Sequence, residues 1–384
     1  MKLWDLYQGK DYKINPTLDR ILKARDYVGN PEKHYKSIIV GGTNGKGSTC
    51  AFLNYLLIEH GVKTGWFVSP HLVRENERLR VNNNFITDDE LDYYVKSLKP
   101  VFEKFELTYF EAVTLVGLLY FKDKGVDMVV WEVGMGGRWD GTRASSPFLG
   151  VLTNIGKDHM KWLGNTVDKI AAEKLEIANG TKAFLIGNNR YPLYPMAVEK
   201  AKEQNTKLFV AGEDFEYSGY IDRQNTYLEE FSFLDFHMKN LKLGLWGKHQ
   251  IDNGALALAS FLSISNLEPI SPKEELIRKA LSNTYWEGRM EILRESPLIM
   301  VDGAHNVSAL VKIIKDVKEH FNIRLVMGSL KDKEWQKELD ILKSYFDEIT
   351  LVPIHYKRAE DIDVMVDYAK SIGFKTHTLS DARD

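Results

Sequence analysis

The sequence predicts an α/β protein whose larger part is a doubly wound parallel sheet. Three observations support this: short β-branched runs such as Ser37–Val40 and Val126–Val133, helical segments between such runs, and a glycine-rich loop after the first run. Strands that alternate with helices in this way pair in parallel, with helices on both faces of the sheet. From Glu213 to Trp246 the pattern changes to short alternating runs, which predicts a small antiparallel sheet attached to this part.

The elements of the larger part follow from hydrophobic periodicity and from capping signals. In order we expect a helix over Thr17–Gly29, strand Ser37–Val40, a helix from Ser48 to Gly61, strand Gly65–Val68, a polar loop over Leu72–Phe85, helices begun by capping boxes of Thr87 with Glu90 and of Thr108 with Glu111, strands Val126–Val133 and Phe148–Ile155, a helix from Thr166 to about Asn179, strand Ala183–Ile186, helix His249–Ser263, and a helix capped by Ser271 with Glu274.

A plausible hinge over Asn283–Met290 precedes a second run of alternating strands and helices. It predicts a smaller, Rossmann-like α/β domain, so we expect one domain over residues 1–284 and another over residues 285–384. Its expected elements are strand Leu298–Val301, helix Val307–Phe321, strand Arg324–Met327, a helix near Glu334–Tyr345, strand Ile349–Pro353 and a helix near Asp361–Ile372.

The composition of the 384 residues narrows the class of protein. A formal net charge of −3 argues against a general nucleic-acid surface. A single cysteine, Cys50, excludes an internal disulfide framework and is typical of a reducing compartment. The amino-terminal stretch has no signal-peptide core, and the longest apolar run, Ala112–Phe121, is too short to cross a bilayer. We expect a cytoplasmic monomer that binds neither nucleic acid nor membrane.

Residues 36–61, KSIIVGGTNGKGSTCAFLNYLLIEHG, read as strand, glycine loop and helix. Backbone N–H groups of bare glycines, the helix dipole and the mobile cation of Lys46 suit a phosphate, and the Ser48 hydroxyl is placed to reach Mg²⁺. The match to the general P-loop pattern is imperfect, because Val40 stands at the first glycine position and Gly47 directly follows the lysine. A glycine-rich turn that binds nothing is the alternative; the strand–loop–helix context favours the phosphate site.

Ligands of open parallel sheets bind beyond the carboxyl ends of the strands. In strand order those positions hold Lys46 and Ser48, then Ser69, then Glu132, then Asp158 and His159. Oxygen donors beside a phosphate loop suit Mg²⁺ bound to a nucleotide. Taken singly, Ser69 before a proline could serve the turn and His159 could be structural. Glu132 in an apolar strand is harder to explain without a partner or a metal.

One lysine falls in an apolar helical stripe. The face is formed by Val167, Ile170, Ala171, Lys174 and Ala178. By default such a lysine snorkels to the rim of the apolar surface. If it is buried instead, desolvation lowers the pKa of its amine. A neutral amine can take up CO₂ and become a carbamate, which is an anionic oxygen ligand.

Other polar residues have both a functional and a structural interpretation. The capping box already explains Glu111, and Asp140 could bind substrate or merely turn the chain. A further set could close over a nucleotide: His249 and Asn253, which share a helix face, Arg289 in the hinge, and Asp302 with His305 after the first strand of the second domain.

Nine motifs run in order from about Leu18 to Lys333: GTNGKGS, SPHLVRENERLRVN, YFEAVT, WEVGMGGRWDGT, TNIGKDHMKWLGNTVDKIAAEK, GKHQIDN, WEGRME, DGAHN and GSLKDK. In sequence and order they resemble the folylpolyglutamate synthase/dihydrofolate synthase family of the Mur-ligase superfamily. The resemblance implies an ATP-dependent ligase that joins L-glutamate to folate or dihydropteroate through an acyl phosphate, with Mg²⁺ at two sites.

The resemblance also implies roles for single residues. The ATP contacts would be Thr43, Asn44, Gly45, Lys46, Gly47, Ser48, Asn253, Arg289 and Asp302. The metal ligands would be Ser48, Ser69 and Glu132 at one Mg²⁺, His159 at a second, and also Lys174, which would be carbamylated. Phe110, Glu111 and Asp140 would line the pterin-side pocket, and His305 would lie near the incoming glutamate. The residues implied in catalysis are Lys46, Lys174, His159 and His305.

The chain departs from the family pattern in several places. Trp139–Arg143 replaces the usual Leu-Asp-Ala-Thr-Asn, Lys157 replaces a leucine, and Val307 replaces a proline. The chain ends at Asp384, before a strand that the family usually adds, so we expect a shortened second domain. Two other functions stay open: the same chemistry on another pterin or carboxylate, and a nucleotide-binding protein without ligase activity.

Overall fold

The structure, a computed structural model, describes residues 3–7, 16–156, 160–188, 190–304, 306–356 and 358–381. The chain folds into two compact units. Unit 1 comprises Met1–Tyr220, Thr226–Leu245 and Gln250–Glu287; unit 2 comprises Ile221–Asn225, Trp246–His249 and Gly288–Asp384.

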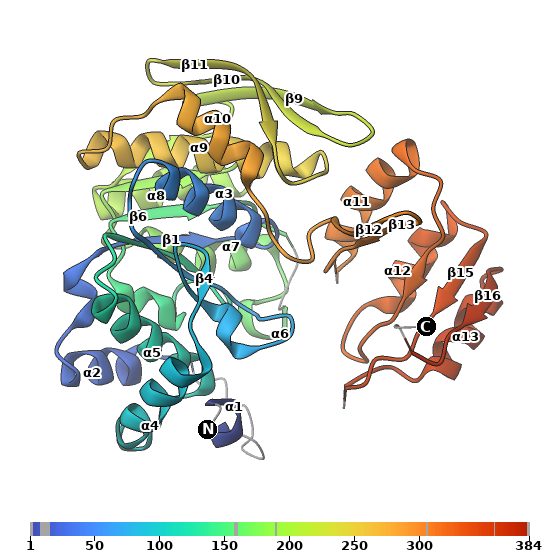
Figure 1. The fold of residues 1–384 in the computed structure, drawn as a ribbon, viewed down its shortest axis with the longest axis horizontal. Coiled ribbons are helices and arrows are strands. Elements are labelled where there is room, and N and C mark those ends of the chain that lie inside the picture. Colours follow the sequence, from blue (N-terminus) through green and yellow to red (C-terminus); the bar gives the residue numbers. More distant parts are fainter. Residues whose placement is uncertain are drawn as a thin grey trace. The chain divides into compact units, whose positions relative to one another are not determined.

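Unit 1 is built around an eight-stranded sheet in the order β4-β3-β2-β5-β1-β6-β7-β8. Figure 1 labels β1, β4 and β6 of this sheet. The six strands from β2 to β8 in this order run parallel, which confirms the predicted doubly wound sheet. The strands are β1 (Lys36–Gly41), β2 (Thr64–Phe67), β3 (Leu79–Val81), β4 (Asn84–Phe85), β5 (Met128–Glu132), β6 (Leu149–Leu152), β7 (Ala183–Ile186) and β8 (Lys207–Val210).

Helices cover both faces of this sheet. Along β1, Ile38 and Val40 pack in the core that includes α3 and α9, whereas Ile39 packs on the opposite face with α8. The helices are α1 (Leu3–Tyr7), α2 (Asp19–Tyr27), α3 (Lys46–Glu59), α4 (Asp88–Lys104), α5 (Tyr109–Asp123), α6 (Met160–Leu163), α7 (Val167–Leu175), α8 (Leu193–Gln204), α9 (His249–Leu267) and α10 (Glu274–Asn283), with 3₁₀ turns η1 (Pro31–His34), η2 (Glu75–Arg78), η3 (Gly141–Ser145) and η4 (Glu176–Ala178).

The predicted small antiparallel sheet is present as β9 (Phe215–Ile221), β10 (Thr226–Phe233) and β11 (Phe236–Leu243). Its apolar side chains, among them Leu228 and Leu241, share the α3/α9 core with Leu258 and Ile277 of α9 and α10. Figure 1 shows this sheet lying over α9 and α10. Alternating residues give it one buried face, as the short alternating runs predicted.

The prediction of a polar loop over Leu72–Phe85 is wrong. The segment contains η2 and the short strands β3 and β4, which extend the main sheet in antiparallel fashion. Arg78 and Arg80 are buried there, at 7% and 5% exposure. Arginines whose charge is satisfied by neighbouring groups break the apolar alternation that normally reveals a strand.

Three further expectations for unit 1 need correction. Ser271 does not cap α10: the N-cap residue is Lys273, and no side chain bonds the helix start there. The strand expected over Phe148–Ile155 is limited to Leu149–Leu152. Helices α1, α6 and α8 and edge strand β8 were not expected at all.

Unit 2 contains a parallel three-stranded sheet, β14-β15-β16, with an apolar core that includes Leu339, Ile349 and Met365. The expected strand Leu298–Val301 exists, but it pairs antiparallel with β12 in a separate hairpin, and β16 was not expected. The elements are β12 (Glu291–Glu295), β13 (Leu298–Val301), α11 (Val307–His320), β14 (Val326–Met327), α12 (Trp335–Lys343), β15 (Glu348–Leu351), α13 (Ile362–Ser371) and β16 (Lys375–Thr378).

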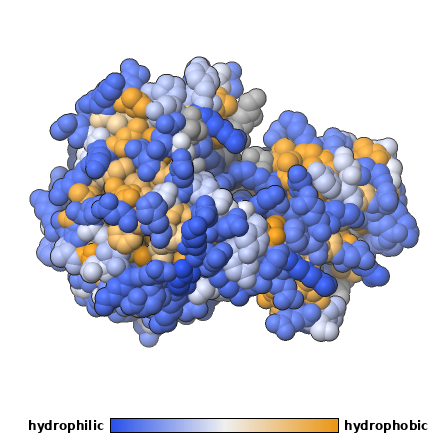
Figure 2. Space-filling view, turned by 90° about the horizontal axis from the view of Figure 1, so that it is seen from above, coloured by the Kyte–Doolittle hydropathy of each residue, from blue (hydrophilic) through white to orange (hydrophobic). Residues whose placement is uncertain are grey.

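Hydrophilic residues cover much of the face shown in Figure 2, and apolar residues gather in smaller patches between them. Among the described residues, no helix combines the length and the apolar character needed to cross a membrane.

Candidate active site

The glycine loop between β1 and α3 is held by the segment that follows β6. The N–H of Thr43 donates to the Asn154 carbonyl at 2.9 Å. The N–H of Asn44 donates to Asn154 Oδ1 at 3.1 Å, and Asn154 Nδ2 donates back to the Asn44 carbonyl at 2.8 Å. This reciprocal pairing fixes the loop before any ligand binds. Neither Asn154 nor Thr153, which donates to the Asn44 carbonyl at 2.7 Å, was singled out from the sequence.

The residues predicted to bind phosphate lie together at this loop. Gly45 is the N-cap of α3 with φ 86°, a backbone conformation that favours glycine. The Lys46 side chain folds back onto the glycine loop, because its Nζ donates to the carbonyls of Gly42 at 3.1 Å and Thr43 at 3.3 Å. Asn253 of α9 reaches the same place: a Cβ added to Gly45 would lie 2.3 Å from its Oδ1.

Glu132 and Ser69 meet at the carboxyl ends of β5 and β2. Glu132 is 5% exposed, and its Oε2 accepts the Ser69 N–H at 3.1 Å. The buried thiol of Cys50 in α3 links this pair to the loop electrostatically. Burial raises the pKa of Cys50, the negative charge of Glu132 raises it further, and the cation of Lys46 lowers it. Glu132 and Lys46 therefore both lie within electrostatic reach of the first turns of α3.

Lys174 of α7 is buried, at 2% exposure, so the default expectation of a snorkelling side chain is wrong. Its Nζ donates to the Gly42 carbonyl at 2.9 Å, the same oxygen that accepts from Lys46. The fold thus brings both lysines to the glycine loop although 128 positions separate them in the sequence. Asp158, His159 and His305 lie outside the described residues.

The donor set at this edge fits a hard cation. Ser48 is 2% exposed in the first turn of α3, and Ser69 and Glu132 add a hydroxyl and a carboxylate. Oxygen ligands of this kind suit Mg²⁺. No three His, Cys, Asp or Glu side chains in the described part of the chain cluster to hold a metal, so a site here would combine one carboxylate with hydroxyl oxygens.

A cavity of about 860 Å³ adjoins this edge. Its lining includes all three predicted substrate residues, Phe110, Glu111 and Asp140, and also Ser69. The Phe110 ring packs on Gly134, where an added Cβ would lie 2.7 Å from Phe110 Cζ. Because Ser69 belongs both to the cavity wall and to the Glu132 pair, the cavity opens beside the candidate metal ligands.

Asp140 anchors the loop that forms one wall of this cavity. Its carboxylate accepts the N–H groups of Met135 at 2.9 Å and Thr142 at 3.0 Å and caps η3. Burial raises the pKa of Asp140, while these hydrogen bonds lower it. The structure shows the turn that the sequence left open for Asp140; the residue also lines the cavity, so substrate binding stays a prediction.

Glu111 has a partner that the sequence did not reveal. Besides closing the predicted capping box, it accepts from Arg20 of α2, with Arg20 Nη2–Oε1 at 3.0 Å and Nε–Oε2 at 3.2 Å. Arg20 and Tyr7 also line the cavity. A single arginine on an ordinary amphipathic helix carries no signal for such a role, so only the folded chain identifies it.

We expect replacement of Arg20 by alanine to lower the free energy of unfolding by about 2 kcal/mol, because it leaves a buried carboxylate without its guanidinium. The two side chains are 17% and 7% exposed, so solvent screens the pair weakly. Urea unfolding measures the change. Lys23→Ala, on the exposed face of the same helix, is the matched control. Equal stability of the two variants would contradict the prediction.

In unit 2, Arg289 and Asp302 lie where residues 288–290 and 302–303 are joined by hydrogen bonds. The Gly303 N–H donates to the Gly288 carbonyl at 2.9 Å, and a Cβ on Gly303 would lie 2.6 Å from Arg289 Nη1. Asp302 accepts the N–H of Met290 at 2.9 Å. These two predicted ATP contacts therefore belong to one cluster.

His249 is held neutral in unit 2. Burial, together with the nearby cations Lys312 and Arg289, lowers its pKa to about 4. In the unfolded chain the His249 imidazole takes up a proton near pH 6.5, whereas in the folded chain it does so only near pH 4. The folded state therefore loses stability as the pH falls from about 6.5 towards 4. We expect the wild type to lose about 2 kcal/mol over this range that His249→Gln does not lose. Urea unfolding at several pH values measures the difference, with His237→Gln, an exposed histidine, as control. Parallel curves for His249→Gln and the wild type would refute it.

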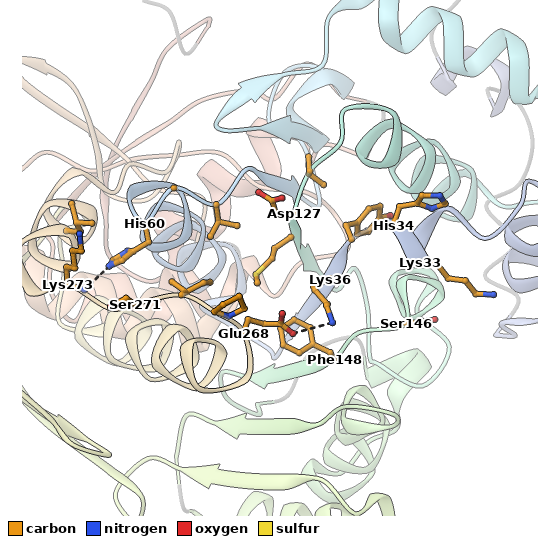
Figure 3. Close-up of a pocket in the computed structure, with 18 residues that line it drawn as sticks. Lys33, His34, Lys36, His60, Asp127, Ser146, Phe148, Glu268, Ser271 and Lys273 are labelled. Atoms are coloured by element: carbon orange, nitrogen blue, oxygen red, sulfur yellow. Dashed lines mark hydrogen bonds and ion pairs between the residues drawn. The ribbon is translucent and has the colours of Figure 1, made fainter.

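A second cavity, of about 900 Å³, lies at the amino ends of β1 and β5, the opposite edge of the sheet from the phosphate loop (Figure 3). Its polar groups contact one another: Lys36 Nζ lies 3.3 Å from Glu268 Oε1, and the Lys273 N–H donates to His60 Nε2 at 3.2 Å. None of the residues predicted to bind a ligand lines it.

The protein has a glycine-rich loop on a doubly wound sheet and a separate α/β unit, and this two-part architecture, together with the matching family models, identifies it as a Mur-type ligase. Residues 40–261 match the Mur ligase middle domain, and residues 288–384 match the glutamate ligase domain of Mur ligases. The chain is 33% identical to the dihydrofolate synthase/folylpolyglutamate synthase of Bacillus subtilis, over 91% of this chain and 83% of that protein. The Escherichia coli protein of the same name is also 33% identical, over 86% and 75%.

Solved structures give the same result. Folylpolyglutamate synthase from Thermotoga maritima superposes with a TM-score of 0.88 at 28% identity, covering 99% of this chain and 90% of that one. A complex of such an enzyme with AMPPCP and folate gives 0.86 at 27%, covering 99% and 97%. The chain belongs to the folylpolyglutamate synthase/dihydrofolate synthase family of Mur ligases.

Proposed function

We propose that the protein is an ATP-dependent ligase that joins L-glutamate to a folate-type carboxylate. One observation carries the proposal: Ser69 lines the 860 Å³ cavity and its N–H binds Glu132, so a carboxylate in that cavity would face the phosphate loop. The related structures hold ADP, AMPPCP or folate, which supports these substrates. Trp139 and Gly141, which belong to the motif that departs from the family pattern, line the cavity, and we propose folate or dihydropteroate as the acceptor.

The reaction needs an activated carboxylate. The acceptor carboxylate attacks the γ-phosphorus of ATP, ADP leaves, and an acyl phosphate forms. The amino group of glutamate then attacks the acyl carbon, phosphate leaves, and the amine gives up a proton as the amide forms. The protein's part is positioning and charge stabilisation. The backbone N–H groups of Gly45–Ser48 would bind the phosphates. Lys46 Nζ, which now donates to the carbonyls of Gly42 and Thr43, would turn to the phosphate oxygens and neutralise their charge.

We propose two Mg²⁺ sites. Ser48, Ser69 and Glu132 would hold one ion, which would neutralise phosphate charge. His159 would bind the second, with carbamylated Lys174 as an anionic neighbour. Burial supports the carbamate, because a second ammonium beside Lys46 at the Gly42 carbonyl is electrostatically unfavourable, whereas a carbamate reverses its sign.

For the remaining substrates we propose Asn253, Arg289 and Asp302 as nucleotide contacts and His305 near the incoming glutamate. We propose residues 1–284 as the ATP-binding domain and residues 285–384 as the glutamate-ligase domain. From composition we further propose a cytoplasmic monomer that needs no nucleic acid or membrane.

Phosphate release tests the proposal directly. The protein is incubated with Mg²⁺ and ATP, and glutamate and a pterin carboxylate are added separately and together. Release only in the presence of both cosubstrates supports a ligase, and dihydropteroate compared with tetrahydrofolate identifies the acceptor. Tight ATP binding without acceptor-dependent release would instead favour a nucleotide-binding protein without ligase activity.

A further inference from the structure

Gly47 is one of the two residues at which the glycine loop departs from the general P-loop pattern, which has Ser or Thr directly after the lysine. It lies in the first turn of α3. Glycine disfavours a helix relative to alanine, so its presence there needs a packing reason.

The indole of Trp286 supplies that reason. A Cβ added to Gly47 would lie 2.8 Å from Trp286 Nε1, 3.2 Å from Cε2 and 3.4 Å from Cζ2. Trp286 is 7% exposed, and its Nε1 has no hydrogen-bond partner among the described residues. A rigid ring edge therefore rests directly on the backbone between Lys46 and Ser48.

The Trp286 indole also contacts Trp66 and Arg80, which hold it in place. Its ring centroid lies 4.6 Å from that of Trp66, and the Arg80 guanidinium carbon lies 4.7 Å from the Trp286 centroid and 4.8 Å from the Trp66 centroid. Arg80 also pairs with Glu287, with Nη2–Oε2 at 3.1 Å and Nη1–Oε1 at 3.3 Å. Such cation–π and ion-pair contacts leave the indole little freedom to move away from the loop.

We propose that Trp286 is a positioning residue for ATP: its indole rests on Gly47 and sets the backbone of the first turn of α3. The role rests on the proposed binding of nucleotide phosphates by this loop. It explains why Gly47 cannot carry a side chain, and it ties the loop to Glu287, the last residue of unit 1.

A double-mutant cycle tests the contact. In the full-length protein, Gly47→Ala should raise the Kd for Mg-ADP about tenfold, because the new methyl displaces either the ring or the helix turn. Trp286→Phe lacks the ring atoms that meet Gly47, so Gly47→Ala in that background should change the Kd by no more than about twofold. Trp66→Phe removes part of the same aromatic cluster without touching Gly47 and should give no rescue.

The Kd is measured by calorimetry at a temperature where thermal melts show every variant folded, so lost stability alone does not move it. Rescue by Trp286→Phe and not by Trp66→Phe supports the proposal. An unchanged Kd for Gly47→Ala, or the same penalty in all three backgrounds, overturns it. Failure of the wild type to bind Mg-ADP would instead overturn the proposed function.

Discussion

Lys46→Ala is expected to lower kcat/KM for ATP by about 10³-fold, the largest effect of any substitution proposed. The Lys46 ammonium is the proposed phosphate-binding cation of the loop, and its Nζ donates to two backbone carbonyls, at 3.1 and 3.3 Å. It can therefore exchange those carbonyls for phosphate oxygens at small cost. Acceptor-dependent phosphate release measures the loss.

Lys242→Ala provides the matched control, because Lys242 lies exposed on β11 in the same unit. It should retain wild-type turnover. Circular dichroism should show that both variants are folded. If Lys46→Ala keeps more than a tenth of the wild-type kcat/KM, the loop does not use this cation on the phosphates.

Lys174→Ala is expected to lower turnover by about 10²-fold and to recover part of it when short-chain carboxylic acids are added. The amine is buried at the Gly42 carbonyl, and removing it leaves space beside the loop. In the proposed modification the neutral amine of Lys174 adds to CO₂, forming an N–C bond and releasing one proton, and an added carboxylic acid would replace the anionic oxygens of that carbamate.

Two measurements distinguish loss of the carbamate from general damage to the site. Added carboxylic acid should not rescue Lys46→Ala, which lacks a cation rather than an anion. In ¹³C-bicarbonate buffer the wild type should give a carbamate NMR signal that Lys174→Ala lacks. Turnover of Lys174→Ala equal to that of the wild type would show that the carbamate has no role.

The sequence revealed features that depend on neighbours along the chain. The capping boxes of Thr87 and Thr108 form as expected, because their partners lie three residues away. Ile38 and Ile39 of β1 point to opposite faces, as a strand buried on both sides requires. The strand–loop–helix arrangement of the glycine loop was likewise recognisable, since strand, glycines and helix are contiguous.

The sequence did not reveal contacts between segments that lie far apart along the chain. The antiparallel strands β3 and β4 escaped detection because Arg80 is buried through Trp66, Trp286 and Glu287, none of them near it in sequence. The Arg20 partner of Glu111, 91 positions away, was missed for the same reason.

The sequence by itself determined that this chain has a glycine-rich loop between a strand and a helix on a parallel sheet, because those signals are periodicity and local spacing. Only the tertiary structure decided that Lys174 is buried at the Gly42 carbonyl, that Ser69 joins the cavity to Glu132, and that Trp286 rests on Gly47. Burial and long-range pairing depend on which surfaces meet when the chain folds, and no spacing within one segment encodes that.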